Sequence, residues 1–197
     1  MLGHEDMIFR ANSGQLFTIF QKEIESLGGK VYFASDSVNL AHTIRDIAVR
    51  SRSLFAVKQR LEIRGENEIT DELTRYGIRV MELENSASPV EMLSKADLAI
   101  TRVDMLIAQT GTLVINTSRD EERLASCLPR VHAAIVPSGK LVLRPNDTAS
   151  YLREHLTKEE PCVLSFISGP SRTADIEMKL ILGVHGPHEV HVIIFEG

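Results

Sequence analysis

Hydrophobic positions along the chain alternate between helical and extended spacing. Residues 7–27 place apolar side chains three and four positions apart, which predicts a helix that ends at Gly28 and Gly29. The same spacing predicts further helices over 35–50, 67–76, 89–95, 121–128, 148–155 and 174–182. Short apolar runs between them predict strands over 30–34, 53–58, 78–83, 112–116, 131–137, 162–167 and 190–195. A strand, a turn and a second apolar run are expected over 97–108.

This alternation of strands and helices predicts an α/β fold. Because crossover helices place successive strands in parallel, we expect a three-layer α/β/α arrangement with a mostly parallel sheet. The runs FAV, CVLSFI and VIIF are nearly all apolar, which is typical of strands buried on both faces. Ligands of such sheets bind beyond the carboxyl ends of the strands. We divide the chain into an N-terminal helix over 1–28 and one compact domain over 29–197.

Composition narrows the class of protein. The chain has 197 residues, 43% apolar and 25% charged, which excludes a disordered chain, a collagen-like chain and a coiled coil. A net charge of −5, few aromatics and no tryptophan argue against a nucleic-acid partner. The first residues hold acids and no apolar run, and no apolar stretch reaches ten residues. We therefore expect neither a signal peptide nor a contact with a membrane.

The two cysteines, Cys127 and Cys162, both lie in apolar contexts. Two thiols are too few for a disulfide scaffold, and they cannot supply a cluster that needs four cysteine ligands. We therefore expect a reduced, cytoplasmic protein with no cofactor of its own.

The segment SGPSRTADIEMKLILGVHGP, residues 168–187, is the strongest candidate for chemistry. It passes from a predicted strand through a Gly-Pro turn into the predicted helix over 174–182. A carboxylate or phosphate at this helix start would meet backbone N–H groups and the side chains of Ser168, Ser171, Arg172 and Thr173. The alternative is that the helix caps itself, because Asp175 and Glu177 fall in its first turn.

Two further candidates lie at strand ends. In AQTGTLVIN, Gly111 lies between Thr110 and Thr112, where a glycine lets a ligand or another backbone approach closely. The threonine hydroxyls there could donate to an oxyanion, and an ordinary tight turn into a core strand is the alternative. Lys58 ends the strand FAVK, so it meets either an anionic ligand or solvent.

Histidines supply the candidate catalytic groups. His132 lies near the start of a buried strand, and is either a catalytic group or a core histidine with a satisfied ring. His185, in a glycine-flanked loop, is the second candidate. His185, His188 and His191 are equally spaced, which suggests a metal site. Residues three apart on a strand point to opposite faces, however, so we expect no metal there.

Four motifs resemble the lactate-utilisation family, whose domain is called LUD. They are TGTLVIN, the R-x5-P-x2-H pattern from Arg123 to His132, SGPSRTADIE and GVHGPHEVHVII. The pairing of ISGPSRTADIE with GVHGP is similar to the short LutC/YkgG-like branch. A weaker match, VKQRLEIRGENEITDELTRYGIRVMELE, resembles the lysine-containing segment of the family. The resemblance covers residues 30–197.

The resemblance implies a fold like the NagB/RpiA/CoA-transferase group and an auxiliary role in oxidising L-lactate to pyruvate alongside iron–sulfur partner proteins. An enzyme that binds a small carboxylated, phosphorylated or acyl-CoA ligand is the alternative, and a purely structural interaction domain is a third. The candidate catalytic residues are His132 and His185. The candidate ligand-binding residues are Lys58, Thr110, Gly111, Thr112, Asn116, Arg123, Ser168, Gly169, Ser171, Arg172, Thr173 and Asp175.

Two positions depart from the family pattern. Gln109 stands where an acidic residue often precedes Thr-Gly, and Arg60 stands where a second lysine is common. If either side chain handles a ligand or a proton, the ligand or the activity of this chain differs from that of the family.

Overall fold

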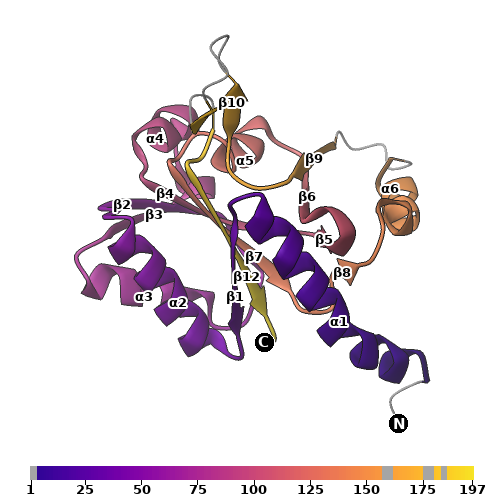
Figure 1. The fold of residues 1–197 in the computed structure, drawn as a ribbon. Coiled ribbons are helices and arrows are strands. Elements are labelled where there is room, and N and C mark those ends of the chain that lie inside the picture. Colours follow the sequence, from indigo (N-terminus) through magenta and orange to yellow (C-terminus); the bar gives the residue numbers. More distant parts are fainter. Residues whose placement is uncertain (1–3, 157–161, 175–179, 183–185) are drawn as a thin grey trace.

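The computed structural model describes residues 4–156, 162–174, 180–182 and 186–197. Within them, a six-stranded parallel sheet in the order β1-β12-β7-β4-β2-β3 forms the centre of the fold (Figure 1). Its strands are Lys30–Ala34 (β1), Glu189–Phe195 (β12), Val131–Pro137 (β7), Leu98–Arg102 (β4), Phe55–Lys58 (β2) and Arg79–Glu82 (β3). Five of them were predicted to within two residues, and β4 lies in the stretch 97–108, where a strand was expected without bounds of its own.

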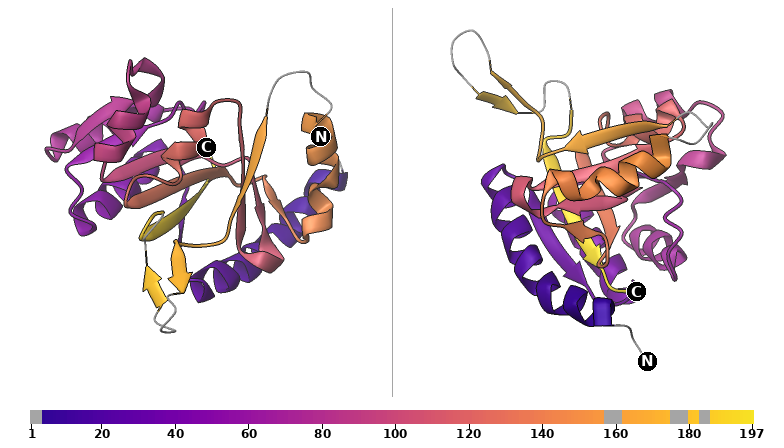
Figure 2. Two further views of the ribbon diagram at one scale, coloured as in Figure 1. Left: turned by 90° about the horizontal axis from the view of Figure 1, so that it is seen from above. Right: turned by 90° about the vertical axis from the view of Figure 1, so that its right-hand side faces the viewer.

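Helices cover both faces of this sheet (Figure 2). One face packs on α2 (Ser37–Arg50) and α3 (Glu66–Arg75), whose buried side chains share a core cluster with β2, β4 and β7. The other face packs on α1 (His4–Ser26), α4 (Pro89–Lys95) and α5 (Asp120–Ala125). The expected three-layer α/β/α arrangement is therefore confirmed.

A second sheet, in the order β8-β5-β6-β9, was not expected from the sequence. It consists of Leu141–Val142 (β8), Met105–Ile107 (β5), Thr112–Thr117 (β6) and Val163–Ile167 (β9), and its β5-β6 and β6-β9 pairs are antiparallel. The expectation that CVLSFI is buried on both faces is wrong. Because β9 lies at the edge of this small sheet, Val163 is 41% exposed and Phe166 is 53% exposed.

The helix predicted over 174–182 is wrong at both of its described ends, and residues 175–179 between them lie outside the described residues. Residues Arg172–Ala174 (β10) and Leu180–Leu182 (β11) are strands that pair antiparallel, and both views in Figure 2 show them standing out from the body of the fold. A short apolar run has no decisive period, so its spacing alone cannot separate a helix from a strand. The remaining helix, α6 (Ala149–Leu156), lies one residue from its predicted bounds.

Candidate functional site

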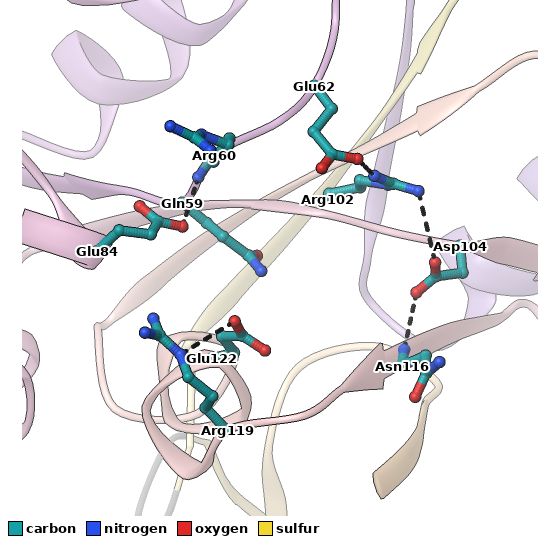
Figure 3. A pocket seen from close by; sticks show the side chains of 9 residues that line it. All are labelled: Gln59, Arg60, Glu62, Glu84, Arg102, Asp104, Asn116, Arg119 and Glu122. Atoms are coloured by element: carbon teal, nitrogen blue, oxygen red, sulfur yellow. Dashed lines mark hydrogen bonds and ion pairs between the residues drawn. The ribbon is translucent and has the colours of Figure 1, made fainter. Parts of the chain in front are cut away.

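A pocket of about 490 Å³ opens at the carboxyl edge of the parallel sheet (Figure 3). Its wall comes from the segments that follow β2, β3 and β4, together with the end of β6 and the start of α5. The lining residues are Gln59, Arg60, Glu62, Glu84, Arg102, Asp104, Asn116, Arg119 and Glu122. Open parallel sheets bind their ligands at this edge, so we take the pocket as the candidate functional site.

Most charged side chains of the wall are paired with one another. Arg102 forms an ion pair with Glu62, and its Nη2 lies 4.0 Å from Asp104 Oδ1. Across the pocket, Arg119 Nε lies 3.3 Å from Glu122 Oε1. Two of the three arginines of the wall are therefore already neutralised by carboxylates of the protein.

The third arginine is different. Its backbone N–H donates to Glu84 Oε1 at 2.8 Å, which fixes the main chain of the loop after β2. The guanidinium of Arg60 is exposed and makes no hydrogen bond or ion pair with the residues that the structure describes. Asp104 Oδ2, in contrast, accepts the backbone N–H of Asn116 at 2.7 Å. Arg60 is thus a cation of the wall whose charge is left for a ligand or solvent.

Lys58 lies at the end of β2 and is only 1% exposed. Its Nζ is 3.3 Å from Glu66 Oε1 and 3.1 Å from Glu82 Oε2. Glu66 Oε2 also accepts the backbone N–H groups of Leu61 and Glu62, at 3.0 Å and 2.9 Å. Burial raises the pKa of Glu66, but the charge and hydrogen bond of Lys58 and the two N–H groups together hold it below its usual value. Lys58 is therefore not a solvated lysine. Through its ion pair with Glu66, it helps to fix the loop that follows β2.

A chain of hydroxyl groups lies at the start of β6. Thr110 Oγ1 is 2.7 Å from Thr112 Oγ1, which is 2.8 Å from Ser168 Oγ. Between the two threonines, Gly111 has a φ of +56°, and a Cβ on it would lie 2.6 Å from the backbone nitrogen of Ile24. Of the two explanations for this glycine, the structure favours the close approach of another backbone, that of α1.

Arg172 lies against the end of α1. Its Nη2 donates to the carbonyl oxygen of Leu27, a helix-terminal carbonyl with no partner further along the helix. A Cβ on Gly169 would lie 2.9 Å from the same oxygen, and Ser171 N–H donates to the carbonyl of Pro187 at 2.9 Å. The helix start expected near Thr173 is not found there, because residues 172–174 form strand β10. The loop instead packs on α1.

The sequence-predicted ligand residues fall in separate places. Thr112 and Asn116 lie at opposite ends of β6, four residues and thus about 13 Å apart. Arg123 Nη2 is 2.9 Å from Asp120 Oδ1 on α5. Thr173 belongs to β10, whereas Asp175 and His185 lie outside the described residues. Only Asn116 lines the pocket itself.

His132 is completely buried within the sheet. Its Nε2 is 2.8 Å from Thr101 Oγ1, and burial, with a smaller effect of His191, lowers its pKa to about 4. His191 is also buried, between the Tyr32 hydroxyl and the Glu189 carboxylate, each at 3.1 Å. His132 does not line the pocket, so its placement favours the core role over catalysis. Its ring is not fully satisfied, however, because Nδ1 is buried without a hydrogen-bond partner among the described residues.

In the described part of the chain, no group of three or more His, Cys, Asp or Glu side chains is placed to bind a metal ion. None of the described helices combines the length and apolar character needed to cross a membrane.

Sequence reasoning missed most of the pocket wall. Of its nine residues, the candidate set held only Asn116, and Arg60 was noted only as a departure from the family pattern. A usable signal was present: Gln59 and Arg60 directly follow the buried strand FAV-Lys58, and Arg102 ends the buried strand LAIT. Polar and charged residues at the carboxyl ends of buried parallel strands lie at the edge where ligands bind.

The sequence is similar to a known family and to several curated proteins. The family model described as LUD domain matches residues 18–195. "Lactate utilization protein C" of Shouchella clausii is 39% identical over 126 residues, 63% of this chain and 55% of that protein. The protein of the same name from Anoxybacillus flavithermus is 35% identical over 122 residues, 62% of this chain and 54% of that protein. The chain thus spans about half the length of the curated relatives it matches.

A solved structure shares the fold. The crystal structure of a DUF162 family protein from Deinococcus radiodurans matches with a TM-score of 0.65 at 19% identity, over 93% of this chain and 98% of that chain. This similarity supports the architecture of both sheets and their helices, and nothing about a ligand.

Proposed function

We propose that this chain, which belongs to the LUD domain family, is a LutC-like auxiliary component of lactate utilisation. The observation that supports it best is the pocket at the carboxyl edge of the sheet, whose wall presents the guanidinium of Arg60 without a partner among the described residues. L-Lactate and pyruvate are small carboxylates, and an arginine is the side chain best suited to bind a carboxylate through two hydrogen bonds.

The redox step belongs to partner proteins in this proposal. Oxidation of lactate to pyruvate releases two electrons and two protons, and an electron acceptor has to take the electrons. The 197 residues include two cysteines, Cys127 and Cys162, so a cluster with four cysteine ligands cannot form within them. We propose that iron–sulfur proteins receive the electrons and that this chain works beside them in the cytoplasm.

A growth and purification experiment tests this role. The gene is deleted in its own host, and growth is compared on L-lactate and on glucose as the only carbon source. We expect slow growth on lactate alone, restored by the full tagged chain, and iron–sulfur proteins that co-purify with that chain under mild conditions. Normal growth of the deletion strain on lactate would contradict the proposed role.

The pocket also supports a second candidate function, an enzyme acting on a small anionic ligand. The two functions differ in what the purified chain does alone. An enzyme converts lactate, a phosphorylated compound or an acyl-CoA ester without a partner, whereas an auxiliary component binds its ligand and leaves it unchanged. Incubation of the purified chain with each compound, followed by product analysis, separates them.

A further inference from the structure

We infer that the pocket at the carboxyl edge selects small monocarboxylates over anions of higher charge, and that Arg60 binds the carboxylate. This inference rests on the proposed function for the location of the site, and it adds the recognising residue and the class of ligand. Three features of the wall support it: the pairing of its charges, their sum, and the way in which the loop after β2 is held.

The pairing of charges leaves Arg60 as the group that lacks a partner. Each carboxylate of the wall already has a partner. Glu62 and Glu122 form ion pairs with arginines, and Asp104 and Glu84 accept hydrogen bonds from backbone N–H groups. The guanidinium of Arg60 has no such contact with the described residues. An incoming carboxylate therefore finds a donor at Arg60 without having to break an ion pair of the protein.

The sum of charges limits which anions can bind. The wall contains three arginines and four acidic side chains, so it has an excess of one negative charge. A second negative charge on the ligand meets repulsion from Glu84, which is hydrogen-bonded to the backbone of Arg60 itself. The single unpaired guanidinium can neutralise one carboxylate. The binding of dianions such as sulfate or a phosphate ester is therefore disfavoured.

Two glutamates fix the main chain of the loop that bears Arg60. Glu66 accepts two backbone N–H groups of the loop and pairs with the buried Lys58, while Glu84 accepts the N–H of Arg60. Because the main chain is already fixed, little conformational entropy of the backbone is lost when a ligand binds. Lys58 is thus a positioning residue for Arg60 and does not contact the ligand.

Binding measurements on the full chain test the inference. Isothermal titration calorimetry at constant ionic strength compares L-lactate and pyruvate with sulfate, inorganic phosphate and citrate. We expect the two monocarboxylates to bind with dissociation constants about tenfold or more below those of the other anions, because the net charge of the wall opposes each added negative charge.

Substitutions then identify the binding residue. Arg60→Ala is expected to weaken lactate binding by about tenfold to a hundredfold, and Arg60→Lys by less, since it keeps the charge and loses the planar pair of donors. Arg64→Ala is the matched control, because Arg64 is exposed on the same loop and does not line the pocket. Glu84→Gln is expected to improve sulfate binding relative to lactate, since it removes one negative charge and keeps an oxygen that accepts the Arg60 N–H.

The outcomes separate this inference from the proposed function. Lactate binding that is unchanged in Arg60→Ala, or equally weakened in Arg64→Ala, would overturn the assignment of Arg60. Sulfate or citrate binding as tightly as lactate would overturn the selectivity. No binding of any monocarboxylate to the unmodified chain would also overturn the inference, whereas growth of the deletion strain on lactate decides the proposed function independently. Thermal unfolding of each variant checks that it remains folded.

Discussion

Replacing Lys58 with methionine should destabilise the protein well beyond the effect of losing a surface ion pair. The ammonium group is 1% exposed and lies between Glu66 and Glu82, so its removal leaves two carboxylates without their cation. Breaking a fully buried pair costs about 3–5 kcal/mol. Because the two carboxylates are 24% and 33% exposed, water solvates them in part, and we expect about 2–3 kcal/mol.

Urea unfolding followed by circular dichroism measures this loss as a lower midpoint with an unchanged slope. Lys95→Met is the matched control, because Lys95 pairs with Glu91 on the surface, where the two side chains are 67% and 65% exposed. We expect that control to change the free energy of unfolding by no more than about 0.5 kcal/mol. Equal effects of the two substitutions would refute the conclusion that Lys58 holds the loop after β2.

A double substitution tests whether Lys58 acts through Glu66. If the two side chains stabilise the loop together, Glu66→Gln should destabilise the Lys58→Met background less than it destabilises the unmodified protein. Additive effects would show that Lys58 stabilises the fold through other contacts, with Glu82 as the remaining charged neighbour.

Three further predictions concern the packing of α1 and the buried histidine. Arg172→Ala should lower the free energy of unfolding by about 1 kcal/mol, since it removes the donor to Leu27, and should leave lactate affinity in calorimetry unchanged. Gly111→Ala should cost more than about 2 kcal/mol in urea unfolding, because the new methyl group meets the backbone of Ile24 at a positive φ. Burial lowers the pKa of His132 from 6.5 to about 4. Between pH 4 and pH 6.5, this histidine is therefore protonated in the unfolded chain and neutral in the native state. Stability to urea should therefore fall as the pH drops from 6.5 to 4, by about 1.4 kcal/mol per pH unit for this group, and His132→Gln should flatten that fall.

Helices and strands whose buried side chains recur at regular spacing could be predicted from the sequence. Elements whose structure depends on which strand pairs with them could not. In α2, Leu40, Ile44 and Ile47 recur at helical spacing because one face of the helix packs on the sheet. β7 was predicted at its observed bounds, since both of its faces are covered. β9 and β11 are both short apolar runs, but β9 lies at a sheet edge and β11 pairs with the short strand β10. No local pattern contains that information.

The candidate site shows the same limit at the level of single side chains. From the sequence, Arg172 was a candidate donor for an anion, whereas Arg60 was noted only because it stands where the family often has a lysine. The structure separates them by partners that come from elsewhere in the chain: the carbonyl of Leu27, which directly follows α1 and lies 145 residues away, accepts a hydrogen bond from the guanidinium of Arg172. For Arg60, the acidic side chains of the pocket wall accept hydrogen bonds or ion pairs from other groups, so its guanidinium has no partner within the described part of the chain. Arg172 of the SGPSRTADIE motif is thus used in packing against the end of α1, whereas the ligand that we propose binds at Arg60, whose guanidinium has no partner among the described residues.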